Sequence, residues 1–308
     1  RQIREGQLYF NPALQANRDH ICRIVRDILI RYDVDGLHID DYFYPYPIKG
    51  KEFADDEWFR KSGMNDKGEW RRENVNHLIY QLHRTVREIK PWIKFGVSPF
   101  GIYRNMKSYE HGSKTNGLQC YDDLNADVLF WINEGWFDYC IPQVYWEIGH
   151  PAADYEELVS WWAKYASGRP LYIGQDVQRT VKAKDEASPT GNQQVEKYTL
   201  QRRQGNVLGS CFWDAASAAN NVDGYRDYLV RPNMIFAVAF DYTPLDKKQQ
   251  KSVLDFCTKE LLTPKGLRSL SPKSSGYNPM YVGPQVQRDY AYHQGTAWPW
   301  LAGFYMEA

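Results

Sequence analysis

Two adjacent aspartates are the residues of this sequence best placed to do chemistry. Residues 36–47 read GLHIDDYFYPYP, so Asp40 and Asp41 directly follow a short apolar run and precede several aromatic residues. Charge repulsion and loss of hydration both disfavour two carboxylates side by side at the edge of a core. Strongly perturbed carboxylates concentrate at functional sites. Either the pair does chemistry, or one aspartate caps the following loop through its backbone N–H groups.

Alternating helix and strand patterns surround this pair. Apolar residues fall at helical spacing at Ile21, Ile24, Val25, Ile28 and Leu29, and again at Val75, Leu78, Ile79, Leu82, Val86 and Ile89. Strand-like runs follow each stripe, at 36–40 and 93–101, and three further helix–strand pairs come after them. This alternation predicts parallel β/α units, with strands starting near residues 36, 93, 138, 170 and 207.

Polar and aromatic residues gather where each predicted strand ends. In a (β/α)₈ barrel the chemistry lies at the carboxyl ends of the strands. No GxGxxG or GxxxxGK[ST] motif follows any strand, which disfavours a nucleotide-binding doubly wound sheet. We therefore expect an α/β fold of the TIM-barrel type. The strand-end residues are Asp40 and Asp41; Ser98, Arg104 and Asn105; Gln143, Tyr145, Trp146 and Glu147; Gln175 and Asp176; and Trp213 and Asp214.

Composition narrows the partners. The 308 residues carry 38 basic and 38 acidic side chains, so we expect no nucleic-acid partner. Aromatic residues make up 15% of the chain, including 11 Trp and 23 Tyr, and flat rings suit stacking on sugars as well as ordinary packing. The five cysteines have no CxxC spacing, and no His/Asp/Glu cluster has metal-ligand spacing, so we expect free thiols and no cofactor.

The apolar content and the N-terminal residues of the chain are the features that would indicate a membrane span or a secretory signal. No run of about 18 apolar residues exists, so we expect no membrane span. The sequence begins RQIREGQLYFNP, without a start methionine or a secretory h-region, and reads as an excerpt of a longer protein. Its compartment therefore cannot be inferred from the N-terminus.

Four motifs carry a family resemblance: YDVDGLHIDDYFYPYP, FGVSPFGIYRN, FDYCIPQVYW and PLYIGQ, in this order. From about residue 8 to 229 the chain resembles the glycosyl-hydrolase-like family ten, bacterial (β/α)₈-barrel proteins of the periplasm or cell envelope. The resemblance implies hydrolysis of bacterial glycans, with cell-wall glycan strands among the substrates. It also implies that three N-terminal units are absent and that these are the last five. Residues outside this sequence, or a partner, would then cover the strand near residue 36.

The resemblance also implies roles for the carboxylates. Glycoside hydrolysis usually needs two carboxyl groups, one that protonates the leaving oxygen and one that acts as nucleophile or as base. The GxHxD run resembles the fourth strand of the α-glycosidase barrel clan, which makes Asp40 the nucleophile candidate. Asp41 would orient Asp40 or bind a sugar hydroxyl. The next strand lacks that clan's glutamate, so Glu147, Asp176 or a residue in the absent units would be the second carboxyl.

Substrate-binding candidates surround these carboxylates. Arg104 would bind an acidic sugar or pair with Asp41, and His38 would face the cleft or form a hydrogen-bonded part of the core. The aromatic candidates would stack on sugars or pack against loops. The full set is His38, Tyr42, Tyr44, Arg104, Asn105, Gln143, Tyr145, Trp146, Gln175 and Trp213.

The last quarter of the chain has a different character. From residue 230 the segments YTPLDKKQQKSVLDFCTKELLTPKGLRSLSP and AYHQGTAWPWL resemble the cytoplasmic glycogen debranching enzymes, whose glucosidase domain is an (α/α)₆ barrel. We therefore expect domains at 1–229 and 230–308, with residues 247–262 helical and no strand added to the sheet. The resemblance implies a glucan site lined by Tyr292, His293, Gln294, Trp298 and Trp300, which otherwise pack between helices.

Three functions remain after these observations. The first is a glycoside hydrolase carried by Asp40 and a second carboxyl. The second is an α-1,6-glucosidase of the debranching type, carried by the tail. The third is a non-catalytic carbohydrate binder that uses the aromatic residues. The longer resemblance favours the first. Because the two resemblances meet without a linker, one natural two-domain enzyme is the least favoured origin.

Overall fold

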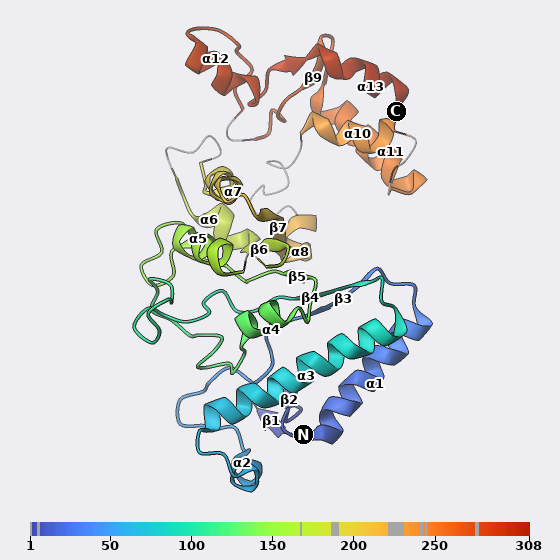
Figure 1. Ribbon diagram of the computed structural model, residues 1–308. Coiled ribbons are helices and arrows are strands. Elements are labelled where there is room, and N and C mark those ends of the chain that lie inside the picture. The colour runs from blue at the N-terminus through green and yellow to red at the C-terminus, as the bar shows by residue number, and fades with distance from the viewer. Residues whose placement is uncertain are drawn as a thin grey trace. The chain divides into compact units, whose positions relative to one another are not determined.

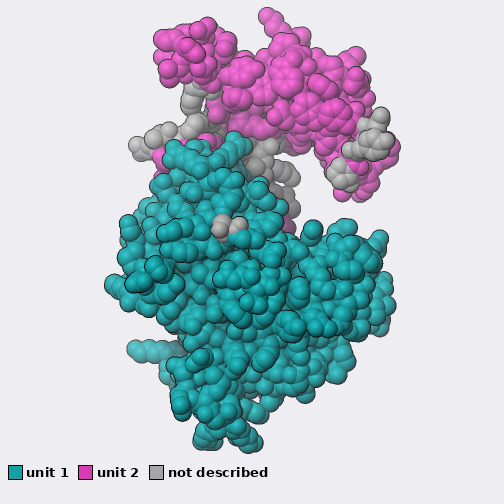
Figure 2. All heavy atoms as spheres, viewed as in Figure 1, with its two compact units in different colours: residues 1–176, 197–213 teal, residues 177–196, 214–308 magenta. Residues whose placement is uncertain are grey.

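The computed structural model describes residues 2–4, 7–166, 168–185, 191–220, 231–240, 243, 245–274 and 277–308 (Figure 1). The chain divides into two compact units, shown in different colours in Figure 2. Unit 1 comprises residues 1–176 and 197–213, and unit 2 comprises residues 177–196 and 214–308. The domain boundary expected near residue 230 lies outside the described residues.

Unit 1 is built on a five-stranded parallel sheet. Its strands follow one another in chain order, and every neighbouring pair is parallel. The predicted starts are confirmed to within one residue, because the apolar runs alternating with helical stripes are local signals. The strands are β3 (Gly36–Ile39), β4 (Lys94–Val97), β5 (Tyr139–Cys140), β6 (Leu171–Asp176) and β7 (Val207–Trp213).

Helices connect these strands in the predicted order. The two longest, α1 (Gln15–Arg31) and α3 (Lys67–Ile89), lie along one another (Figure 1). At the start of α3 the Asp66 side chain accepts a hydrogen bond from the Glu69 N–H, a common N-cap arrangement. The remaining helices up to β7 and just beyond are α2 (Asp56–Ser62), α4 (Val128–Glu134), α5 (Tyr155–Tyr165), α6 (Val177–Lys182), α7 (Gln194–Arg203) and α8 (Ala215–Ala219).

The two faces of the sheet differ. Phe95, Val97 and Ile173 are fully buried against the helices. Residues that alternate with such positions point to the opposite face, where His38 is exposed and Tyr139 is half-buried. The Tyr139 ring lies over Gly96, and a Cβ there would come within 2.0 Å of the tyrosine Cζ. A glycine on β4 thus makes room for an aromatic ring on the open face.

A short hairpin precedes α1. Strands β1 (Gln2–Arg4) and β2 (Gln7–Tyr9) pair antiparallel, which the sequence did not predict because neither run has a clear alternation of apolar and polar residues. Among the described residues, β3 and β7 form the two edges of the parallel sheet.

Unit 2 contains the C-terminal segment. Helix α11 (Lys247–Phe256) begins with a capping box at Asp246 and continues as a π-helical turn, Cys257–Leu261. The prediction of helix over 247–262 is therefore confirmed except for its last residue, which opens β8. The other elements are η2 (Pro232–Ile235), α10 (Phe236–Ala239), β8 (Leu262–Thr263), β9 (Gly266–Arg268), α12 (Gln285–Tyr292), β10 (Ala297–Trp298), η4 (Pro299–Leu301) and α13 (Ala302–Glu307).

The tail is less helical than the sequence predicts. Strands β8, β9 and β10 form a separate antiparallel sheet, and none of them joins the five-stranded sheet within the described residues. Gly266 has a φ of +120°, a backbone conformation that L side chains rarely adopt, which allows the tight β8–β9 turn. A small cluster around Leu261, Leu267 and Trp298 forms the core here.

Candidate functional site

Asp40 lies exposed just after β3, and its two carboxylate oxygens have different surroundings. Oδ1 accepts a hydrogen bond from the Asp41 N–H at 2.9 Å and from Gln143 Nε2 at 2.5 Å. The same Gln143 amide also donates to the Ser98 carbonyl at 2.9 Å. No donor among the described residues contacts Oδ2. The ends of β3, β4 and β5 thus hold one oxygen of Asp40 and leave the other open.

Asp41 is buried, with 2% of its surface exposed. The Tyr46 hydroxyl donates a hydrogen bond to its carboxylate. Burial raises the pKa of Asp41 to about 6; the negative charge of Asp40 acts in the same direction, and the hydrogen bond from Tyr46 opposes both. Sequence reasoning missed Tyr46, because no periodicity rule indicates which tyrosine of the YFYPYP loop turns back toward the aspartates.

Tyr145 lies near Asp40, Asp41 and a third carboxylate, Asp176. Burial raises the pKa of the Tyr145 hydroxyl, and the charges of Asp40, Asp41 and Asp176 raise it further. All three carboxylates therefore lie within electrostatic reach of one hydroxyl group. Asp176 ends β6, opposite Trp213 on β7.

Glu147 lies half-buried in the loop after β5. Its backbone carbonyl accepts hydrogen bonds from the N–H groups of His150 and Tyr155, both at 3.3 Å, which fold this loop back toward the start of α5. The preceding residue, Trp146, is also half-buried and packs edge-on against Phe100, with ring centroids 5.5 Å apart. The loop thus holds both candidates at the end of β5.

The exposed aromatic candidates are few. Tyr42 is 58% exposed and Trp213 57% exposed. His38 is exposed rather than part of the core; its ring stacks on Tyr139, and its Nδ1 lies 3.2 Å from the tyrosine hydroxyl. Partial loss of hydration beside Tyr139 lowers the pKa of His38, while the charge of Asp40 opposes that shift.

Two candidates have their side chains engaged elsewhere. Tyr44 is 2% exposed and packs edge-on against Phe53, so its ring belongs to the core and offers no surface to a sugar. Arg104 donates to both oxygens of Asp122, at 2.8 and 3.0 Å, so its carboxylate partner is Asp122 and not Asp41. A bidentate pair of this kind occupies the donors that an acidic sugar would need.

Two polar candidates belong to buried hydrogen-bond networks. Gln175 is 1% exposed, and its Nε2 donates to Ser210 Oγ at 2.8 Å. Asn105 is buried, and its Oδ1 accepts from Thr115 Oγ1 at 2.8 Å and from the Gly117 N–H at 3.2 Å. Both side chains stabilise their surroundings, since a buried amide requires partners for its donors and acceptors.

Three of the five tail candidates lie around the buried ring of a fourth, Trp298. Trp298 is 6% exposed, and its centroid lies 5.1 Å from Tyr292, 5.3 Å from His293 and 5.7 Å from Trp300. Trp300 remains 52% exposed, whereas Gln294 is buried and its Oε1 has no partner among the described residues.

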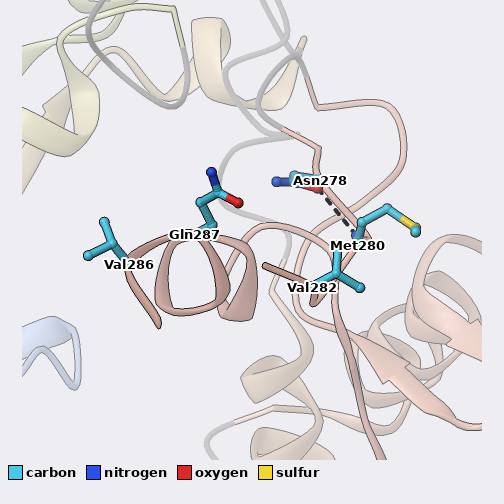
Figure 3. Close-up of a pocket in the computed structure, with 5 residues that line it drawn as sticks. All are labelled: Asn278, Met280, Val282, Val286 and Gln287. Carbon is cyan, nitrogen blue, oxygen red and sulfur yellow. Dashed lines mark hydrogen bonds between the residues drawn. The ribbon is translucent and has the colours of Figure 1, made fainter. Parts of the chain in front are cut away.

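A pocket of about 360 Å³ lies beside α12. Its lining comes from α12 and from the segment before it, where the Met280 N–H donates to Asn278 Oδ1 at 3.2 Å (Figure 3). Among the described residues, none of the five tail candidates and no carboxylate lines it. The lining residues are Asn278, Met280, Val282, Val286 and Gln287.

In the part of the chain that the structure describes, no group of three or more His, Cys, Asp or Glu side chains could hold a metal ion. In the same residues, no helix is long and apolar enough to cross a membrane.

Comparisons with known proteins give two family matches. The Glycosyl hydrolase-like 10 model matches residues 3–189, more than half of the chain, and the Amylo-alpha-1,6-glucosidase model matches residues 167–308.

Three named relatives show how much of the chain these matches cover. Glycosyl hydrolase YngK of Bacillus subtilis (strain 168) is 40% identical over 230 residues, which cover 73% of this chain and 45% of that protein. Glycosyl hydrolase DigH of Escherichia coli (strain K12) is 40% identical over 168 residues, 53% of this chain and 38% of DigH. Glycogen debranching enzyme of Saccharomyces cerevisiae is 33% identical over 92 residues, 27% of this chain and 6% of the yeast protein. This chain therefore spans less than half the length of each.

Proposed function

Because this chain belongs to the glycosyl hydrolase-like 10 family, we propose that it supplies part of the active site of a glycoside hydrolase, with Asp40 as the nucleophile. The observation that carries the proposal is the asymmetry of the Asp40 carboxylate. A nucleophile needs one oxygen with an available lone pair and a fixed direction of attack. Two N–H donors hold Oδ1, while no donor among the described residues contacts Oδ2 of the exposed Asp40.

The second carboxyl is Asp176. Glycoside hydrolysis needs a partner that protonates the leaving oxygen, and the two carboxyls must face the same cleft. The charges of Asp40, Asp41 and Asp176 all raise the pKa of the Tyr145 hydroxyl. This supports the choice, since it indicates that Asp176, at the end of β6, lies in the same polar region as Asp40. Glu147 is the alternative, because its half-buried side chain follows the neighbouring strand.

The sugar-binding surfaces are the rings that remain accessible near these strand ends. Tyr42 and Trp213 are more than half exposed, and Tyr145 and Trp146 are half-buried. Sugar rings would stack on them through their C–H faces. Tyr44, Asn105, Gln175 and Arg104 take no part, since burial or an ion pair engages each of them. The substrate class is a bacterial glycan, with cell-wall glycan strands as the first candidate.

The proposed enzyme is longer than this sequence. In this proposal the five parallel units, which follow one another in the sheet, are the last five of a (β/α)₈ barrel, and residues outside this sequence, or a partner, cover the edge at β3. We place the end of the barrel at about residue 229, with the debranching-type segment from 230 onward. Tests of activity therefore use the natural full-length protein.

The test is Asp40→Asn in that protein. The amide is nearly isosteric, so folding should survive, while hydrolysis of isolated cell-wall glycan strands should fall at least about a hundredfold. The release of reducing ends and the melting temperature are measured. Asp33→Asn is the control, because Asp33 is exposed and, among the described residues, its carboxylate pairs only with Lys90, at 3.9 Å. Wild-type turnover in Asp40→Asn would show that the aspartate pair is structural.

The match of residues 167–308 to Amylo-alpha-1,6-glucosidase favours a second candidate, cleavage of α-1,6-linked glucose by the tail. Release of glucose from a branched limit dextrin, unchanged in Asp40→Asn, would support it. A protein that binds glycan equally well with Asp or Asn at position 40, and releases no reducing ends, would instead be a carbohydrate binder.

A further inference from the structure

A chain of hydrogen bonds runs from Tyr46 to Asp40. The Tyr46 hydroxyl donates to the Asp41 carboxylate, and the Asp41 N–H donates to Asp40 Oδ1 at 2.9 Å. Two neighbours hold the Tyr46 ring edge-on, Tyr42 at 5.7 Å and Phe100 at 6.0 Å between centroids. The position of the hydroxyl is therefore set by packing as well as by its acceptor.

We propose that Tyr46 is a positioning residue, whose hydroxyl holds the buried Asp41 carboxylate so that Asp40 keeps one oxygen open for reaction. This inference rests on the proposed function, which gives Asp40 its role. It also makes Asp41 a proton switch. The ionised carboxylate accepts from Tyr46, whereas a protonated one can donate its O–H to Asp40 and occupy the lone pair needed for attack.

Two neighbours control the ionisation of Asp41. The titratable groups that face its carboxylate are Asp40, Tyr42, Tyr46, Tyr145 and Cys120. Burial raises the pKa of each tyrosine and of the thiol, so these groups are neutral near pH 7. The charge of Asp40 then disfavours ionisation of Asp41, and the hydrogen bond from Tyr46 favours it.

A definite pH dependence follows. Hydrolysis should increase as Asp41 loses its proton, near pH 6 in the wild-type protein. Tyr46→Phe keeps the ring but removes the donor that stabilises the ionised carboxylate. The acidic limb of the pH–rate profile should then move to higher pH by about one to two units, the usual effect of one hydrogen bond to a charged group.

The experiment compares Tyr46→Phe with Tyr103→Phe in the full-length protein. Tyr103 is the control, because its hydroxyl also donates to an aspartate, Asp127, at 2.9 Å; Tyr103 is buried, whereas Tyr46 is half-buried. The probe is isolated cell-wall glycan strands, with reducing ends measured from pH 4.5 to 9. A carbon-13 NMR titration of the Asp41 carboxyl, identified by its loss in Asp41→Asn, gives a readout that needs no substrate.

Tyr46→Phe should shift both the acidic limb and the NMR titration of Asp41, while Tyr103→Phe should lower only the melting temperature. An unshifted titration in Tyr46→Phe would overturn the inference. If Tyr46→Phe does not fold, Asp41→Asn replaces it. Asn resembles the protonated acid, so activity should be at least about tenfold lower at pH 8 and should lack the limb near pH 6.

The two proposals fail separately. An active Asp40→Asn enzyme, or a wild-type protein inert toward the glycan, counts against the proposed function, and the NMR titration still tests the role of Tyr46. If Asp40→Asn loses activity and the pH–rate profile of Tyr46→Phe is not shifted, only the positioning role proposed for Tyr46 is contradicted.

Discussion

Asp41 in unit 1 and Glu260 in unit 2 are both nearly buried, at 2% and 7% exposed, but their neighbours have opposite charge. Glu260 accepts from the Lys273 ammonium group at 2.6 Å, an arrangement that compensates for its burial. Asp41 lies beside the carboxylate of Asp40. The first arrangement stabilises a fold, whereas the second costs stability and points to function.

The aromatic residues of the two regions differ in the same way. Near the strand ends of unit 1, the half-buried Tyr145 lies within electrostatic reach of three carboxylates. In the tail, Tyr292 and Trp300 both contact the buried ring of Trp298. The rings of the two regions therefore differ in their polar neighbours, and this difference supports the proposed binding surface in unit 1.

The largest expected effect is on the stability of the tail. Trp298→Ala removes the central ring of its small core and should destabilise this segment by about 3 to 5 kcal/mol. Amide hydrogen exchange of the full-length protein measures this locally. Protection in β3–β7 should stay unchanged. A parallel loss of protection in the five-stranded sheet would mean that the two regions unfold together, and the comparison would lose its basis.

Replacing each of the two buried carboxyl groups, Asp41 and Glu260, by its amide should change the free energy of unfolding in opposite directions. Because the pKa of Asp41 in the folded protein, about 6, exceeds the ordinary 3.8, the folded state binds this proton more tightly and the free energy of unfolding falls as pH rises from about 4 to 6. Asp41→Asn cannot ionise, so it should be more stable than wild type by up to about 3 kcal/mol at pH 8, with no gain at pH 3.

Glu260→Gln should instead lose about 1 kcal/mol at pH 8, since it removes the charge that pairs with Lys273. Urea unfolding at the two pH values measures both variants. The contrast between a like-charged neighbour at Asp41 and an oppositely charged one at Glu260 would be contradicted by either of two results. One is a Glu260→Gln variant more stable than wild type, and the other is a change in stability of Asp41→Asn that does not depend on pH.

Asp176 and Glu147 are the two candidates for the carboxyl group that protonates the leaving oxygen. Asp176→Asn should lower glycan hydrolysis at least about a hundredfold, because loss of a general acid or base typically costs that much. Glu147→Gln should lower it less than about fivefold. Single-variant kinetics on isolated glycan strands decide between them, and the reverse order of the two effects would move the proton-donating role to the loop after β5.

The smallest expected effect separates two tryptophans of similar exposure, Trp213 at 57% and Trp300 at 52%. Trp213→Ala should raise the KM for the glycan about fivefold, in line with the loss of one stacking contact of about 1 kcal/mol. Trp300→Ala should leave that KM unchanged. Equal effects of the two substitutions would show that the tail contributes to the same binding surface.

The strands of unit 1 could be predicted because their signals are local. Runs such as GLHID and PLYIG alternate with apolar stripes at helical spacing, and the predicted starts differ from the observed ones by at most one residue. The β1–β2 hairpin and the small sheet of the tail were missed. Their strands are two or three residues long and, unlike the equally short β5, do not belong to a longer strand-like run that follows a helical stripe.

The sequence by itself determined that Asp40 and Asp41 follow a strand and lie among aromatic residues. Only the tertiary structure decided that Asp40 is exposed and Asp41 buried, that Gln143 from a distant strand end binds Asp40, and that Arg104 pairs with Asp122. The physical reason is that strand alternation assigns a side chain to a face, whereas its partners come from segments up to 103 residues away and depend on how the strands pair.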